Sequence, residues 1–138
     1  MSHVAAGNGA SPNTVELTVP ANPAYISVVR TVTASLAARR DFTIEEIDDL
    51  RIAVDEASAL LLPHAGDGGS LSASFDGADN TLIIRVSVPL PPGRSAVEPD
   101  QTSFAWMVLA ALADSVTSTA ADDRLALTLT KARGARST

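Results

Sequence analysis

The stretch DFTIEEIDDLRIAVDEASALLLPHA, residues 41–65, predicts a long amphipathic helix. Thr43 and Glu46 have the spacing of a capping box, in which each side chain accepts a hydrogen bond from the other residue's backbone N–H. Pro63 has no N–H of its own and clashes with the preceding turn, so the helix should end or kink there. The apolar side chains that recur at helical spacing and form the buried face are Ile47, Leu50, Val54, Ala57 and Leu61.

The segments around this helix predict a two-layer fold. Period-two alternation and β-branched residues are typical of strands, and a stretch with four prolines is typical of a loop. The predicted strands are 14–19, 70–76, 81–88, 115–119 and 124–131, the loop is 89–101, and further helices follow Asn22-Pro23 and fit 103–114. We therefore predict an α+β two-layer sandwich, with a mixed, mainly antiparallel sheet and helices on one face. This domain, residues 14–133, should lie between a disordered tail, 1–13, and a frayed tail, 134–138.

The helical periodicity also predicts which side chains point inward. In the first helix the predicted apolar stripe leaves Arg30 outside it, toward solvent or a partner. In the second helix, which begins after Thr43, Arg51 and Asp55 have the spacing of an exposed ion pair. The side chains expected to face the core are Tyr25, Val28, Val29, Val32 and Leu36 in the first helix, and Phe104, Val108, Ala111 and Leu112 in the last.

The composition excludes several classes of function. The chain has 138 residues, a formal net charge of −6 and no cysteine, so disulfides, thiolate nucleophiles and zinc–cysteine sites are excluded. The acidic balance gives no electrostatic footprint for nucleic acid or an anionic membrane. No apolar run approaches the ~20 residues that span a bilayer, and the N-terminus lacks the layout of a signal peptide. We expect a cytoplasmic protein with no direct contact to nucleic acid or membrane.

Two side chains in the opening stretch are candidates for chemistry, Glu56 and His64. The chain has no Walker-type phosphate loop and none of the GxGxxG, HExxH or GxSxG motifs. On the pattern alone, Glu56 fits a solvated helix carboxylate better than a catalytic base. His64 likewise fits a capping or packing residue better than a general base.

A resemblance changes this balance. LRIAVDEA, residues 50–57, is similar to the N-box of RsbW/SpoIIAB-type anti-sigma factors, serine kinases with the GHKL (histidine-kinase-like) ATP-binding fold. With TSFAWMVLAALADSV, 102–116, and LALTLTKA, 125–132, the resemblance covers about residues 14–133 in the same element order. It implies that Glu56 matches the glutamate that activates a substrate hydroxyl or water near the terminal phosphate of ATP. His64 matches the histidine that closes the motif.

The chain departs from this family's pattern at four nucleotide-binding positions. Leu60 stands where an asparagine should hold magnesium, and leucine offers no oxygen ligand. The loop at 89–101 lacks the Asp-x-Gly-x-Gly stretch that recognises adenine, and its Asp100 comes late. Phe104 and Trp106 replace a Gly-x-Gly that would let backbone amides approach phosphates. We therefore expect a degenerate ATP site with no metal site or required cofactor, and Glu56 as a relic or structural carboxylate; an ATP–magnesium site is the alternative.

The resemblance also implies partners. Arg30 matches the family's arginine that grips the sigma factor, although an ordinary solvated arginine explains it equally well. The expected function is an anti-sigma factor that sequesters a stress- or development-type sigma factor, is released by a STAS-type anti-anti-sigma protein, and forms a homodimer. One alternative is an active serine kinase with Glu56 as the base, and another is an unrelated α+β binding domain. An acidic run could meet basic surface on a partner or be only a solvated face: Glu45, Glu46, Asp48 and Asp49.

Overall fold

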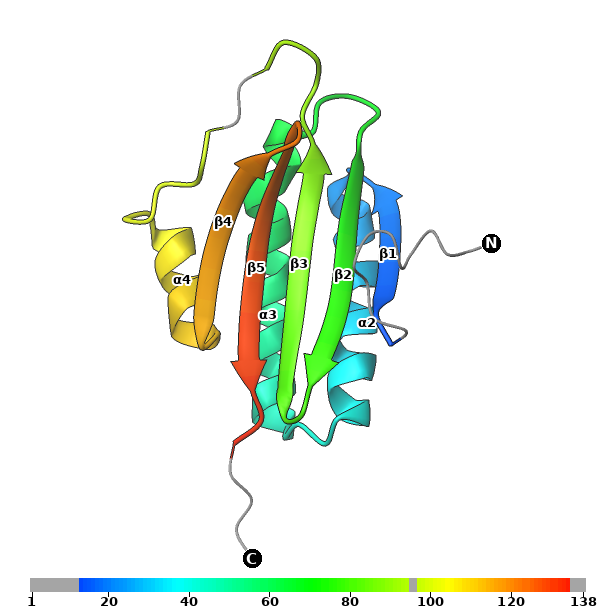
Figure 1. The fold of residues 1–138 in the computed structure, drawn as a ribbon, viewed down its shortest axis with the longest axis vertical. Helices are drawn as coiled ribbons and strands as arrows, with labels where there is room; N and C mark the ends of the chain where they lie inside the picture. The colour runs from blue at the N-terminus through cyan, green and yellow to red at the C-terminus, as the bar shows by residue number, and fades with distance from the viewer. Residues whose placement is uncertain (1–12, 95–96, 135–138) are drawn as a thin grey trace, which may run out of the picture.

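Within residues 13–94 and 97–134, which the computed structural model describes, five antiparallel strands form one sheet in the order β1-β2-β3-β5-β4. The described α-helices lie together on one face of this sheet (Figure 1). The elements are β1 Val15–Pro20, η1 Pro23–Tyr25, α2 Ile26–Arg39, α3 Ile44–Leu61, η2 Leu62–His64, β2 Ser70–Ala78, β3 Thr81–Pro89, α4 Phe104–Leu112, β4 Ser115–Ala121 and β5 Arg124–Ala132. The predicted two-layer α+β sandwich is confirmed, and its described strand pairs are all antiparallel. The predicted tails fall outside the described residues, apart from Asn13 and Gly134.

The middle strand, β3, carries the centre of the core. Its alternate residues face the helices, because successive side chains of a strand point to opposite faces. In the register, Ile84 stands opposite Phe75 on β2 and Leu129 on β5, so one apolar row crosses three strands. The inward side chains of β3 are Leu82, Ile84, Val86 and Val88, each at most 1% exposed.

Helix α3 packs along the sheet and contacts β3 and β5. The predicted capping box forms at its start: Thr43 Oγ1 accepts from the Glu46 N–H at 3.1 Å, and Glu46 Oε1 accepts from the Thr43 N–H at 2.7 Å. Its apolar face is buried as predicted, with Leu50 and Leu61 both 0% exposed. The helix ends at Leu61, and Pro63 lies in the short turn η2.

Glu46 also connects Gly134, which follows β5, to the start of α3. Its second carboxylate oxygen, Oε2, accepts a hydrogen bond from the Gly134 N–H at 2.7 Å. The hydrogen bond from the Thr43 N–H lowers the pKa of Glu46 most; the bond from Gly134 and the charge of Lys131 lower it further, and desolvation opposes them. The ionised carboxylate therefore stabilises the folded state.

Replacing Glu46 by alanine is expected to lower the free energy of unfolding by about 1 kcal/mol at neutral pH, the typical worth of a helix cap. Because the folded pKa lies below the ordinary value of 4.5, this stabilisation is fully present above that value and is lost as pH falls through the folded pKa. Urea unfolding from neutral pH to about pH 3 measures both effects. Glu45→Ala is the matched control; equal losses for both variants at neutral pH would contradict the capping role.

Two helices bury a face that differs in part from the predicted one. In α2 Val29 is buried as predicted, together with Thr33 and Ala37. Val28 and Tyr25, which lies just before the helix in η1, were predicted to face inward but are 38% and 41% exposed. Thr33 can be buried because its hydroxyl donates to the Val29 carbonyl oxygen at 2.7 Å.

In α4 the inward predictions for Phe104 and Ala111 were wrong, since Phe104 is 80% exposed and Ala111 is exposed as well. Ser103 caps the helix by accepting from the Trp106 N–H at 3.2 Å. With the helix starting there, Trp106 and Leu109 face the core, at 7% and 0% exposure. The spacing of the apolar residues alone could not choose between these faces, because the helix is apolar nearly all round.

Candidate functional site

Arg30 meets Asp55 where α2 and α3 pack against each other. The Nε atom of Arg30 donates to both carboxylate oxygens of Asp55, at 2.9 and 3.0 Å. Both side chains are 35% exposed, so the pair is only partly shielded from water. Since hydrogen bonds between charged groups are stronger than neutral ones, Asp55 holds Arg30 in a defined orientation at the surface.

The predicted ion pair between Arg51 and Asp55 was wrong. The Nη1 atom of Arg51 lies 3.6 Å from Asp48 Oδ1, one turn back on the same helix. Asp55 instead takes a partner from the neighbouring helix, at a sequence distance of 25 residues. Arg51 is the more exposed of the two arginines, with 47% of its side chain accessible. Asp55 pairs with the less exposed arginine because water and salt screen the attraction between partly buried charges less than between exposed ones.

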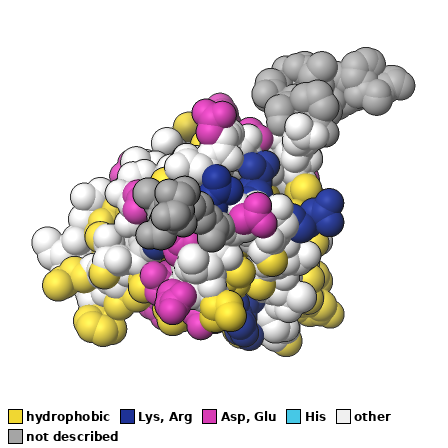
Figure 2. All heavy atoms as spheres, turned by 90° about the horizontal axis from the view of Figure 1, so that it is seen from below, with side chains coloured by type: hydrophobic (Ala, Val, Ile, Leu, Met, Phe, Trp, Pro, Cys, Tyr) yellow, Lys and Arg dark blue, Asp and Glu magenta, His cyan; other side chains and the backbone are white. Residues whose placement is uncertain are grey.

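These residues surround a shallow surface cavity of about 400 Å³ on α2 and α3, lined by Arg30, Asp48, Arg51, Ile52 and Asp55. Ile52 places an apolar side chain, 48% exposed, among the charged ones. Acidic and apolar side chains lie near one another at the end of the molecule where α3 begins (Figure 2). Arginine beside exposed apolar groups is typical of protein–protein contact surfaces.

Glu56 and His64 lie farther along the same segment. Glu56 is half-buried on α3, and no hydrogen bond or ion pair reaches its carboxylate from the described residues. His64 is half-buried in η2, beyond the end of α3 at Leu61. No hydrogen bond joins the two side chains within the described part of the chain. Glu56 does not line the cavity around Arg30.

Leu60, one turn after Glu56, packs against the core and is partly buried. Its hydrocarbon side chain cannot ligate magnesium, which requires oxygen ligands. In residues 13–94 and 97–134 no three His, Asp or Glu side chains are grouped so that they could hold a metal ion. None of the helices in those ranges has the length and apolar character needed to cross a membrane.

Hydrogen bonds within the chain fix the residues just before α4 and the first turn of that helix. Asp100 Oδ1 accepts from the Thr102 hydroxyl at 2.6 Å and from the Thr102 N–H at 2.8 Å. These two bonds, the hydroxyl first, lower the pKa of Asp100. Asp100 therefore closes a turn before the helix. At the helix start the Trp106 amide is already bonded to Ser103.

Sequence reasoning missed the part of this site that lies on α3. Asp55 was assigned to the wrong arginine, and the exposure of Ile52 was not recognised. Ile52 does fall outside the apolar face of α3, which is the one signal that could have identified it. No local signal could pair Asp55 with Arg30, because that contact depends on how two helices pack.

Comparison with known proteins finds a matching family and several relatives. A family profile described as "Histidine kinase-like ATPase domain" matches residues 19–131. Serine-protein kinase RsbW of Halalkalibacterium halodurans is 42% identical over 77 residues, which cover 55% of this chain and 48% of that protein. The RsbW of Bacillus subtilis is 34% identical over 76 residues, covering 53% and 48%. The chain thus spans about half the length of the curated relatives it matches.

Among solved structures, the crystal structure of the RsbU and RsbW domains of a Mycobacterium tuberculosis protein is similar to this one. The match covers 89% of this chain and 33% of that chain, with a TM-score of 0.63 and 16% sequence identity. At 16% identity the similarity shows a shared fold only, because most side chains differ between the two proteins.

Proposed function

Because the chain belongs to the histidine kinase-like ATPase domain family, we propose that it is an anti-sigma factor of the RsbW kind. It binds and sequesters an alternative sigma factor of the stress or development type, and a STAS-type anti-anti-sigma protein competes for that surface and releases it. The partial matches to RsbW proteins support this assignment. A homodimer is part of the same proposal, with light scattering as its test.

The observation that carries the proposal is the surface around Arg30. Its guanidinium is held by Asp55 beside the exposed Ile52, in a cavity open to solvent. A side chain held in place before binding loses less conformational entropy when a partner arrives. Arginine is also one of the residues that most often dominate binding energy in protein interfaces. This surface therefore supports recognition of a protein partner.

We further propose that the ancestral nucleotide site is not used for efficient phosphoryl transfer. The residues do not fit an ATP–magnesium complex, because Leu60 supplies no metal ligand and the Asp100 carboxylate already serves a turn. Trp106 fills core space near the start of α4, where a phosphate-binding loop needs small residues and free amides. Glu56 is then a relic of that site or a structural carboxylate.

The second candidate is an active serine kinase, and one observation favours it. Among the described residues nothing neutralises or hydrogen-bonds the Glu56 carboxylate, which leaves it able to accept a proton from a serine hydroxyl. Its position in the LRIAVDEA segment, residues 50–57, matches the catalytic glutamate of the resembled family.

Reconstituted transcription tests the main proposal. RNA polymerase carrying one of the alternative sigma factors of the same genome is assayed with and without the purified chain. Loss of transcription that is specific for one sigma factor, and that its anti-anti-sigma protein reverses without ATP, is the expected result. If no alternative sigma factor is inhibited at micromolar chain concentrations, the proposed function is wrong.

Calorimetry with ATP and magnesium separates the two candidates. We expect a dissociation constant weaker than about 1 mM, because the ligands for metal and adenine are missing. Glu56→Ala should change sigma-factor affinity less than about twofold, since an inert carboxylate contributes nothing to that surface. Magnesium-dependent binding at micromolar ATP, lost phosphorylation in Glu56→Ala and intact phosphorylation in Glu45→Ala would establish the kinase instead.

A further inference from the structure

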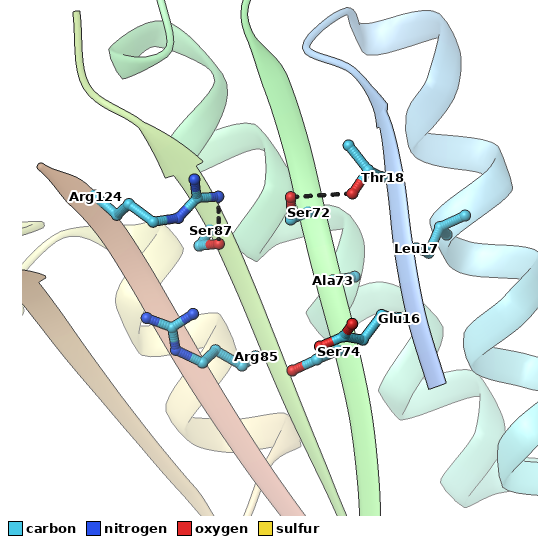
Figure 3. Close-up of a pocket in the computed structure, with 9 residues that line it drawn as sticks. All are labelled: Glu16, Leu17, Thr18, Ser72, Ala73, Ser74, Arg85, Ser87 and Arg124. Carbon is cyan, nitrogen blue, oxygen red and sulfur yellow. Dashed lines mark hydrogen bonds between the residues drawn. The ribbon is translucent and has the colours of Figure 1, made fainter. Parts of the chain in front are cut away.

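The face of the sheet opposite the helices carries a shallow cleft of about 280 Å³ (Figure 3). Side chains from β1, β2, β3 and β5 line it. Ser72, Ser74 and Arg85 alternate with the buried residues of their strands, so they point away from the helices, which lie together on one face of the sheet (Figure 1). The polar and charged lining residues are Glu16, Thr18, Ser72, Ser74, Arg85, Ser87 and Arg124. A solvated sheet face with a cleft in it, bordered by convergent polar groups, is a candidate binding site.

Two arginines dominate the charge of this cleft. Arg85 extends from β3 toward β5, Arg124 extends from β5 toward β3, and Ser87 lies between their guanidinium groups (Figure 3). Within the described residues neither guanidinium has a carboxylate oxygen within 4.0 Å. This lack of compensation contrasts with the chain as a whole, whose 16 acidic residues outnumber its 10 lysines and arginines. Two neighbouring positive groups without an anion repel each other and attract one from solution.

Ser87 adds a shielded hydroxyl to the two charges. It is only 3% exposed although it faces outward, and its Oγ accepts a hydrogen bond from Arg124 Nη2 at 2.9 Å. A serine hydroxyl that accepts one bond keeps its own hydrogen for a further acceptor. Arg124 is thereby positioned over Ser87, and both can donate to the same bound oxygen atoms.

Glu16, on the β1 side of the cleft, restricts where a negatively charged group can bind. Ser74 is paired with Glu16 on β1 and with Arg85 on β3, so two strand spacings, about 10 Å, separate Glu16 from Arg85. The Glu16 carboxylate repels an anion near β1. The favourable position for negative charge is therefore over β3 and β5, near Ser87.

We propose that this cleft binds the oxyanion group, a phosphate or a carboxylate, of a small ligand. Arg85 and Arg124 supply the charged donors, and the Ser87 hydroxyl supplies a third. Guanidinium groups match the planar or tetrahedral oxygens of such anions and bind them with short, charge-assisted bonds. The cleft is independent of the proposed partner surface on α2 and α3, so either proposal can fail alone.

Nuclear magnetic resonance titration of the isotope-labelled full chain tests this site. Sodium phosphate and sodium acetate are added in separate series at constant ionic strength. We expect saturable shifts of the backbone amides in 72–74, 85–87 and 124–126. The tighter of the two probes identifies the ligand group as phosphate or carboxylate. Shifts that grow without saturation for both probes would overturn the proposal.

Charge-neutralising variants provide the matched comparison. Arg85→Gln combined with Arg124→Gln should raise the half-saturation concentration at least about tenfold, because two charge-assisted bonds are lost. Arg39→Gln combined with Arg94→Gln removes the same charge at other places on the surface. This pair should change the half-saturation concentration by less than about twofold. Unshifted resonances in the helices confirm that both variants fold. Equal weakening by the two pairs would mean that net charge alone attracts the anion, and the site would be rejected.

Discussion

Charge reversal at Arg30, in Arg30→Glu, is expected to weaken sigma-factor binding by a factor of about 100 or more. Truncating an interface arginine that dominates binding typically loses 2 kcal/mol or more, and reversing its charge adds repulsion. The substitution also places a carboxylate beside Asp55, the present partner of Arg30. Binding to the purified sigma factor, measured by calorimetry, gives the affinity, and urea unfolding shows whether the domain remains folded.

A charge swap separates binding from folding. In Arg30→Asp combined with Asp55→Arg, an ion pair between α2 and α3 can re-form with its charges exchanged. The single substitution Asp55→Asn should lower stability by no more than about 1 kcal/mol, because the pair is partly solvated. We expect the swap to be folded but unable to bind the sigma factor. Wild-type affinity in the swapped protein would mean that Arg30 acts only as a structural ion-pair partner.

Replacing Leu50 by alanine is expected to lower the free energy of unfolding by about 2–5 kcal/mol. Leu50 lies on the inner face of α3, is 0% exposed and belongs to the central apolar cluster. Its removal leaves a cavity that the surrounding side chains fill only in part. Because a domain of this size is stable by about 5–15 kcal/mol, a large share of its stability would be lost. Urea unfolding measures the change in the free energy of unfolding. The dependence of this free energy on urea concentration should be the same in both proteins.

Ile52→Ala is the matched control on the same helix. Ile52 stands two residues later but is 48% exposed, in the cavity proposed to bind a partner. Its truncation should change stability by no more than about 0.5 kcal/mol, while weakening the proposed sigma-factor contact. If Leu50→Ala were as mild as Ile52→Ala, the assignment of Leu50 to the core would be wrong.

Much of the fold could be predicted because its signals are local. The capping box of Thr43 and Glu46 is a contact between residues three apart, and it forms as expected. The strand predicted at 81–88 from its β-branched residues and its alternation forms as β3, since both signals lie within a few neighbouring residues. The prediction failed for Phe104, whose helix has apolar residues on nearly every side and therefore no local preference for one face.

The candidate site was predicted less well than the fold. Arg30 was recognised as lying off the buried face of its helix, and it is partly exposed. Its carboxylate partner, Asp55, could not be found from the sequence, because Arg51 has better spacing along the same helix. The role of Glu56 is tested by the calorimetry and phosphorylation experiments above, and the role of His64 stays a prediction.

By itself, the sequence determined the secondary structure, the helix caps and the buried side of α3 and β3, because these depend on residues a few positions apart. Only the tertiary structure decided which charges meet. Packing of α2 on α3 brings Arg30 to Asp55, and strand order brings Arg85 and Arg124 together over Ser87. Which charged side chains pair depends on their distance and solvent exposure after the helices and strands have packed. Neither quantity can be read from the spacing of residues within one element.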